Sequence, residues 1–269
     1  MSATHRWGSA AIDLAARDLP ALKVSFLISH APSRGKLLEL GCGEGKILRT
    51  LLRERPALEL LGCDVRDVSP SDRAFEFRRI ATARSGWERI PAADGELDAV
   101  LFADVLEHTP DPAATLAELW RVLRPGGSLL GFVPLEGERW SAYALYRALL
   151  GQDLYLHTKD HVQSFTLAGA RALLGRFQIV EERFAYHLLG QAMDASFFAA
   201  ARLPRLARFW WTENRYYAPP PTPGESAALL PRALNHLLAL GNRVAHAESS
   251  LLGRVPWLSA GLLFAARRP

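Results

Sequence analysis

The sequence predicts an α/β fold in which a doubly wound, mostly parallel sheet carries helices on both faces. Two observations lead to this prediction. Short apolar runs alternate along the chain with helix-like segments, which is typical of a parallel sheet with crossover helices. The first apolar run, 37–40, leads into a turn with glycines at 41, 43 and 45, and a helix-like segment follows over 47–52. Strand, glycine turn and helix form the start of a nucleotide-type site in such a sheet.

The other elements follow in order along the chain. A helix-like stretch over 9–29 is interrupted at Pro20, which should begin a second helix. After the first strand, further strands are predicted over 58–63, 75–80, 97–103, 128–133, 177–184 and 257–268. Further helices are predicted over 113–123, 140–150, 167–175 and 225–250. The segment 186–257 is therefore a helical insertion between the last two strands.

The glycine turn and the second strand predict a ligand site. Glycine has no Cβ, so the turn can bend sharply and approach a ligand, and the following helix directs its N-terminus to the same place. A dinucleotide fingerprint has its third glycine three residues after the second. Here Lys46 holds that position and the third glycine, Gly45, comes one residue early. Asp64, which ends the second strand about twenty residues after the turn, can accept hydrogen bonds from both hydroxyls of a ribose.

With four motifs in this order, the chain resembles a class I S-adenosylmethionine (SAM) dependent methyltransferase. Residues 39–45 resemble the first motif of that family, and Asp64 resembles its ribose-binding acid. Residues 97–112 resemble the "F-D-V-V-x-x-x-V-L-E-H" segment, and 121–127 resemble the "R-V-L-K-P-G-G" turn. The resemblance covers residues 35–185 and the last strand. It implies a seven-stranded Rossmann-like sheet with SAM as cofactor and S-adenosylhomocysteine as product.

The resemblance also implies the residues that hold the cofactor. Glu39 and the glycine backbone should hold the aminopropyl end, Asp64 the ribose, and Ala103 or Asp104 the methionine part. The full set is Glu39, Gly41, Cys42, Gly43, Gly45, Asp64, Val65, Ala103 and Asp104. The chain departs from the family after the third strand, because 81–85 contains no acid to bind the adenine amino group. Adenine is then held by backbone groups, by Thr82 or otherwise. Near the N-terminus, Arg6 either pairs with the methionine carboxylate or lies in solvent.

Catalytic residues are harder to infer, because methyl transfer from a sulfonium mainly requires that the acceptor be positioned and water excluded. A hydroxyl acceptor needs a general base, and histidine titrates in the right pH range. The candidates are His161, His108 and His157, with Asp160 as an orienting carboxylate, and each histidine can instead be a hydrogen-bonded loop residue. Residues 161–166 also match the family's "H-x-x-x-F-T" segment. Aromatic residues that either line the acceptor pocket or fill a core are Trp140, Tyr143, Tyr146 and Tyr155.

The insertion suggests the kind of acceptor. From residue 190 onward, nine Lys and Arg face four Asp and Glu, and the arginines at 202, 205 and 208 share one face of a helix rich in Phe and Trp. Such a segment can contact a membrane surface through 195–217, cover a greasy substrate as a lid, or pack on the core. We therefore expect methyl transfer to a hydrophobic small molecule or lipid-like acceptor. The alternative is a SAM-binding protein without transferase activity, acting as a sensor or interaction protein.

Composition narrows the class and location of the protein. With 49% hydrophobic and 22% charged residues the chain is typical of a globular protein, and the formal charge of +4 without a basic cluster argues against nucleic acid as a partner. We expect no membrane span and no secretory signal. The two cysteines, Cys42 and Cys63, are expected as buried thiols in a cytoplasmic protein, and no metal site is expected. The predicted division is an N-terminal cap over 1–34, the core over 35–185, the insertion over 186–257 and a final strand over 258–269.

Overall fold

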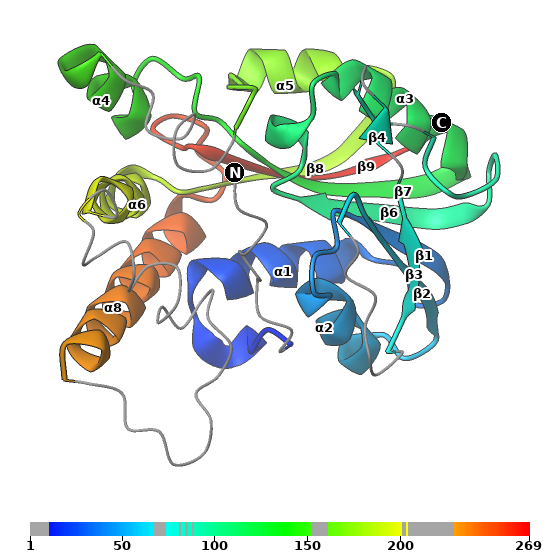
Figure 1. The fold of residues 1–269 in the computed structure, drawn as a ribbon, viewed down its shortest axis with the longest axis horizontal. Coiled ribbons are helices and arrows are strands. Elements are labelled where there is room, and N and C mark those ends of the chain that lie inside the picture. Colours follow the sequence, from blue (N-terminus) through cyan, green and yellow to red (C-terminus); the bar gives the residue numbers. More distant parts are fainter. Residues whose placement is uncertain are drawn as a thin grey trace.

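The computed structural model describes residues 11–66, 74–80, 82–83, 86–87, 89–151, 161–200, 203 and 229–269. Its centre is a seven-stranded sheet with the order β3-β2-β1-β6-β7-β9-β8 (Figure 1). The strands are β1 (Gly35–Leu40), β2 (Leu58–Asp64), β3 (Glu76–Arg79), β6 (Leu97–Ala103), β7 (Leu123–Pro134), β8 (Gln178–Ala185) and β9 (Gly261–Arg267). A separate antiparallel pair joins β4 (Thr82–Ala83) to β5 (Gly86–Trp87).

The sheet is parallel except for its last strand. β1 pairs in parallel with β2 and β6, while β3 and β7 extend the sheet in parallel on either side. β9 is inserted antiparallel between β7 and β8. The seven predicted strands and the mostly parallel sheet are therefore confirmed. β7 begins at Leu123 rather than at Ser128, because the turn at 124–127 is a register shift within the strand.

Helices cover both faces of the sheet, and the sequence of β1 shows why. Leu37 and Leu38 are fully buried on opposite faces, as expected for a strand that alternates its side chains. On the face of Leu37 lie α1 (Leu19–His30) and α2 (Lys46–Glu54). On the face of Leu38 lie α3 (Pro112–Val122) and α5 (Leu167–Leu173), as Figure 1 shows. The doubly wound arrangement is thus confirmed.

The N-terminal segment packs on the sheet within the part that is described. A short 3-10 helix, Leu14–Ala16, leads to α1, where Pro20 stands in the first turn. The Asp18 carboxylate accepts a hydrogen bond from the Ala21 N–H at 2.9 Å and so caps the helix. This confirms the prediction of a helix that begins at Pro20. Arg6 lies outside the described residues.

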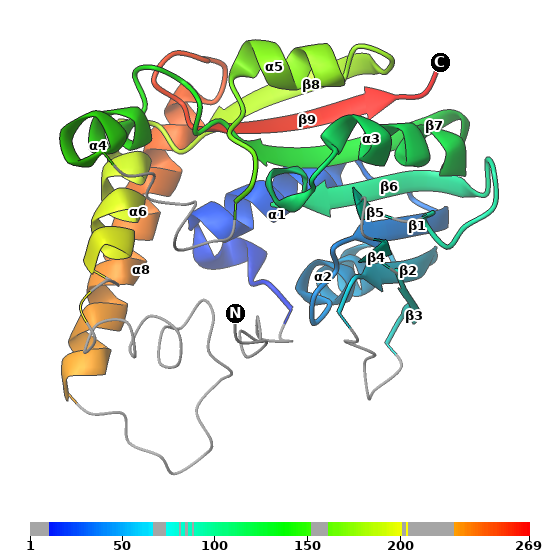
Figure 2. The same ribbon diagram turned by 45° about the horizontal axis from the view of Figure 1, so that its top comes forward.

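The insertion begins and ends with helices that pack against the rest of the protein. α6 (Leu188–Ala200) and α8 (Leu229–Leu252) come between β8 and β9 in the sequence. They lie side by side, and α6 packs against α4 (Ala142–Leu150) (Figure 2). Gln191 of α6 connects α4 with the segment before β9. Its side chain accepts a hydrogen bond from the Ala142 N–H at 2.8 Å and donates one to the Leu258 carbonyl at 2.7 Å. Tyr143, a candidate for the acceptor pocket, is buried and donates to Asp194 at 2.9 Å.

These contacts support the packed arrangement for the described ends of the insertion. Most of the segment 195–217 lies outside the described residues, so its contact with a membrane stays a prediction, as does the division of the chain into four parts. Among the helices that are described, none combines the length and the apolar character that a membrane span requires.

Candidate functional site

The glycine turn lies at the carboxyl end of β1 and is tied to the end of β2. The N–H groups of Gly41 and Cys42 both donate to the Cys63 carbonyl, at 2.8 and 3.0 Å. Gly41, Gly43 and Gly45 have φ of 70, 50 and 82°, the left-handed conformation that glycine adopts without strain. A Cβ at Gly45 would lie 2.3 Å from the Phe75 ring, so this glycine permits packing.

Gly43 differs from the other two glycines of the turn in its surroundings. Among the described residues, a Cβ built there meets only the Arg66 guanidinium, at 3.5 Å. Its N–H donates to the Asp64 carboxylate at 2.9 Å, and the other carboxylate oxygen of Asp64 accepts from the Arg66 N–H at the same distance. Asp64 is buried, and each of its oxygens accepts a second, longer hydrogen bond from the Arg66 guanidinium, at 3.3 Å from Nε and 3.4 Å from Nη2. The turn is therefore held open beside a carboxylate, the arrangement that the sequence predicts for a ribose site.

Glu39 is the second buried carboxylate at this end of the sheet. It accepts a hydrogen bond from the Leu48 N–H in the first turn of α2, whose N-cap residue Gly45 has no side chain to do so. Its other oxygen, Oε2, is buried without a hydrogen-bond partner among the described residues. Burial, with the nearby Asp64 charge, raises the pKa of Glu39 well above its usual range.

The raised pKa of Glu39 predicts how stability depends on pH. The folded state binds the proton more tightly than the unfolded chain, whose carboxyl has a pKa of about 4.3. The resulting stabilisation is fully present below that pKa and is lost as pH rises through the raised pKa of the folded state. Glu39→Gln removes the titration. The free energy of unfolding of the wild type should fall relative to the variant by about 1.4 kcal/mol per pH unit in this window.

Urea unfolding at a series of pH values measures this difference, and Glu59→Gln is the matched control because Glu59 is an exposed carboxylate on the neighbouring strand β2. The slope for Glu39→Gln should exceed that for the control. A flat difference for Glu39→Gln would mean that the carboxyl is ionised in the folded protein.

The two cysteines are free thiols beside these carboxylates. Both Cys42 and Cys63 are buried, and burial raises the pKa of each thiol far above its usual range. The prediction of buried thiols rather than a disulfide is confirmed. Neither thiol is therefore a nucleophile at neutral pH, because the reactive form is the thiolate.

Ala103 and Asp104 lie at the carboxyl end of β6, on the same edge of the sheet. Asp104 has φ of 55° and forms an ion pair with Lys23 of α1. The Lys23 ammonium also lies 4.3 Å from the centroid of the Phe132 ring. Val65, after β2, is partly buried against the core. Lys23 is therefore a further candidate site residue, and it could not be identified from the sequence because nothing in its helical pattern marks it.

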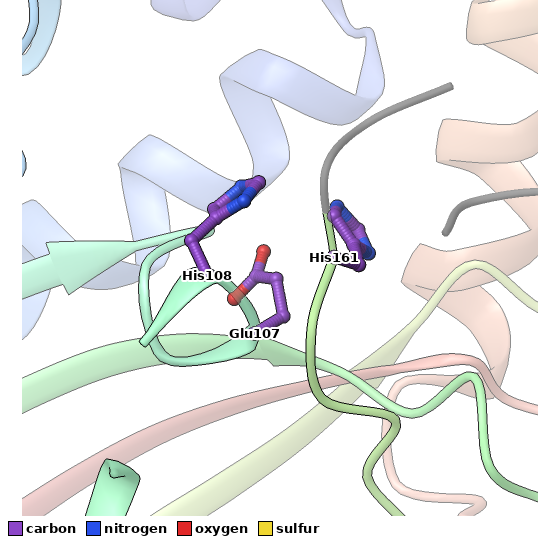
Figure 3. A group of neighbouring side chains, drawn as sticks. All are labelled: Glu107, His108 and His161. Carbon is purple, nitrogen blue, oxygen red and sulfur yellow. The ribbon is translucent and has the colours of Figure 1, made fainter. Parts of the chain in front are cut away.

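A cluster of carboxylates and histidines lies at the same edge (Figure 3). His161 is buried, and its Nδ1 is 2.9 Å from Oε2 of Glu136, which follows β7. The exposed ring of His108 meets the ring of His161 edge-on, with 4.8 Å between centroids. Glu107, between them, is fully buried, and neither of its carboxylate oxygens has a hydrogen-bond partner among the described residues.

The backbone explains how these residues meet. Glu107 and His108 belong to the 3-10 helix η2 (Leu106–His108), which follows β6. The N–H groups of Val162 and Gln163 both donate to the Glu107 carbonyl, at 2.8 and 3.0 Å, and this fixes the segment after His161 against η2. Burial, together with the charges of Asp104 and Glu136, raises the pKa of the Glu107 carboxyl well above its usual range.

Two of the three predicted histidines are thus brought together. His157 and the orienting carboxylate Asp160 lie outside the described residues, whereas the described partner of His161 is Glu136. The sequence analysis quotes Glu107 only as part of the Leu-Glu-His segment and does not identify Glu136. Its position directly after an apolar strand is a signal that could have found it, since ligands bind at the carboxyl ends of such strands.

The chain is similar to known proteins in sequence and in fold. Residues 38–131 match the family described as methyltransferase domain. The chain is 31% identical over 135 residues to a ubiquinone biosynthesis O-methyltransferase from Thiobacillus denitrificans. The aligned region covers 46% of this chain and 55% of that protein. It is also 31% identical over 109 residues to a ubiquinone/menaquinone biosynthesis C-methyltransferase from Desulfotalea psychrophila, covering 38% and 43%. The match spans about half the length of these curated relatives.

Solved structures share the fold. A geranyl diphosphate C-methyltransferase from Streptomyces coelicolor has a TM-score of 0.52 at 12% identity, covering 98% of this chain and 91% of that one. The [4+2]-cyclase SpnF has a TM-score of 0.55 at 18% identity, covering 99% and 87%. The matched domain, the order of the four motifs and the sheet topology agree. Residues 38–131 carry a methyltransferase domain, and the chain has the fold of the class I SAM-dependent methyltransferases, whose cofactor is SAM.

Proposed function

We propose that this protein transfers a methyl group from SAM to an oxygen of a hydrophobic small-molecule acceptor. The observation that carries the proposal is that the open side of Gly43 and two buried carboxylates lie at the same edge of the sheet as the histidine cluster. A cofactor site and an acceptor site are therefore neighbours, at the carboxyl ends of the parallel strands.

The residues of the glycine turn fit SAM. Asp64 can accept from the ribose hydroxyls when they displace the longer bonds from the Arg66 side chain. The buried Oε2 of Glu39, which has no hydrogen-bond partner among the described residues, fits a donor such as the cofactor's ammonium group. Gly43 leaves the space that a close ligand needs. The full set that we assign to the cofactor is Glu39, Gly41, Cys42, Gly43, Gly45, Asp64, Val65, Ala103 and Asp104. The adenine contacts are not assigned, because residues 81, 84 and 85 lie outside the described part.

The cluster at His161 and His108 fits the reacting end of the acceptor. SAM, when bound, supplies an electrophilic methyl carbon, and transfer to an acceptor hydroxyl breaks the carbon–sulfur bond, leaves its electron pair on sulfur and releases the hydroxyl proton to water. His161 is oriented for contact with the acceptor by Glu136, and His108 lies beside it at the surface.

A hydrophobic acceptor is supported by two observations. Apolar side chains are exposed near this edge, on α4 and on the segment after the cluster: Leu145, Leu149 and Val162 are 60, 72 and 54% exposed. Relatives of the chain are named for the biosynthesis of ubiquinone and menaquinone. The exposed side chains favour an acceptor with an apolar part, and the name of the O-methyltransferase relative favours transfer to oxygen.

The test is methyl transfer from SAM with a labelled methyl group to paired acceptors: a catechol with a long alkyl chain and a dihydroxybenzoate of similar ring chemistry. The alkylated acceptor should give roughly tenfold or higher kcat/KM, since each buried CH₂ contributes about 0.8 kcal/mol. Preference for the polar acceptor would contradict the hydrophobic site. Saturable SAM binding without transfer to any acceptor would instead favour a non-catalytic SAM-binding protein.

A further inference from the structure

We propose that Glu107, His108 and His161 together bind one divalent transition-metal cation, with Zn²⁺ as the best fit, beside the acceptor. One donor atom from each of the three side chains lies within 4.8 Å of the other two. In Figure 3 the carboxylate of Glu107 lies between the two imidazole rings. The role of this cation in the reaction rests on the proposed function, whereas its binding does not.

Glu107 provides the observation that points to a ligand. Its side chain is fully buried, and both carboxylate oxygens lack a hydrogen-bond partner among the described residues. A buried carboxylate without partners is costly, and buried charges in proteins are paired or coordinate metals. The nearest charged groups from neighbouring elements include Asp104 and Glu136, which add negative charge, and Lys23, which Asp104 engages. This environment favours a cation at the cluster.

The cluster also has the outer contacts of a metal site. Histidine ligands usually donate their second ring N–H to a carboxylate or carbonyl, which fixes the tautomer and turns the other nitrogen toward the metal. His161 has this partner, because its Nδ1 lies 2.9 Å from the buried Glu136 carboxylate. With Nδ1 as the donor, Nε2 carries the lone pair. The two backbone bonds to the Glu107 carbonyl hold the two segments together.

The donor set identifies the class of cation. Mg²⁺ and Ca²⁺ prefer ligands that are all oxygen, whereas imidazole nitrogens suit Zn²⁺ and other transition metals. Two histidines and one carboxylate are a ligand set found in zinc enzymes, and three protein ligands leave a position open. An acceptor hydroxyl in that position would bind the cation, have its pKa lowered and lose its proton to bulk water before methyl transfer. This role restricts the class of acceptors to molecules with a hydroxyl group that can bind a metal ion.

This site is distinct from the one that the sequence analysis excludes. That expectation rests on the cysteines, which have no histidine at metal spacing. The proposed ligands come instead from two segments more than fifty positions apart in the sequence, His108 and His161, which the fold brings together.

The experiment is calorimetric titration of the full chain, without a histidine tag and treated with a chelator, with ZnCl₂ and separately with MgCl₂. Zn²⁺ should bind at one site and roughly a hundredfold more tightly than Mg²⁺. Glu107→Gln, which keeps the shape of the side chain, should weaken Zn²⁺ binding by well over tenfold, and Glu136→Gln by roughly ten- to a hundredfold. His236→Gln is the control, because His236 is an exposed histidine on α8.

A second readout guards against loss of folding. The melting temperature should rise with Zn²⁺ for the wild type and for His236→Gln, and not for His108→Gln, which changes an exposed residue and should fold normally. Absence of a Zn²⁺ site in the wild type would overturn the proposal. So would Zn²⁺ affinities of Glu107→Gln and His108→Gln that equal the affinity of the wild type. SAM titration and a methyl-transfer assay with the same protein distinguish the proposed function from the proposed cation site. Zn²⁺ binding without methyl transfer contradicts only the proposed function, and SAM binding without a Zn²⁺ site contradicts only the cation.

Discussion

Asp64→Ala should weaken the binding of SAM and of S-adenosylhomocysteine by roughly ten- to 150-fold, which corresponds to about 1.5–3 kcal/mol for hydrogen bonds to a charged group. Asp64 is buried at the carboxyl end of β2, and its oxygens already accept from the N–H groups of Gly43 and Arg66. The substitution therefore removes the ribose acceptors and also the contact that holds the glycine turn in place. Calorimetric titration of both cofactor forms measures the loss.

Two further variants separate these effects. Glu59→Ala removes an exposed carboxylate from the same strand and should leave the affinity unchanged. Asp64→Asn keeps the size of the side chain and one acceptor oxygen, so the turn should remain ordered while the charge is lost. Its affinity should lie between those of the wild type and Asp64→Ala. Unchanged affinity in Asp64→Ala would remove Asp64 from the cofactor site.

The fold was largely predictable because its signals are local. The central strands of the sheet are short apolar runs, and helices begin at recognisable capping or breaking residues, as Asp18 and Pro20 show for α1. The glycine turn could be placed for the same reason, since the spacing of Gly41, Gly43 and Gly45 requires no knowledge of the tertiary structure. The short β4–β5 pair was not predicted, because two-residue strands leave no periodic pattern.

The acceptor side could be predicted only in part, because its contacts join distant segments. His108 and His161 could be named from their motifs, but their meeting edge-on could not. The partner of His161 was expected among its sequence neighbours, at Asp160, whereas Glu136 lies 25 residues away in sequence. Whether the buried Glu107 carboxylate has a hydrogen-bond partner depends on all the elements that pack around it. A feature of this kind is visible only in three dimensions.

The cofactor side and the acceptor side therefore differ in how they are built. The proposed cofactor side centres on one turn, braced by carboxylates at the ends of two adjacent strands, β1 and β2, and also includes Ala103 and Asp104 at the end of β6. The acceptor side combines the ends of β6 and β7 with the segment that begins at His161. Substitutions in the turn should thus change cofactor affinity alone, whereas substitutions in the cluster should leave it intact and change the acceptor reaction.

Gly43→Asn should reduce SAM affinity by roughly a hundredfold or more while leaving the protein folded. Asparagine tolerates the left-handed conformation better than most residues, so the φ of 50° at this position costs little for this side chain. Within the described part of the chain, a Cβ built on Gly43 meets only the Arg66 guanidinium, at 3.5 Å, and an asparagine would project into the volume that we assign to the cofactor. Calorimetry measures the affinity, and urea unfolding measures the stability.

Gly95→Asn is the matched control for this substitution. Gly95 has φ of 67°, and a Cβ there meets only the Arg124 Cα at 3.8 Å, so the backbone cost and the available space are similar. It lies in the loop before β6, whereas the glycine turn follows the carboxyl end of β1. The two variants should therefore lose a similar, small amount of stability, and only Gly43→Asn should lose cofactor binding. Equal SAM affinity in both would place the cofactor away from the glycine turn, whatever the fate of the Asp64 variants.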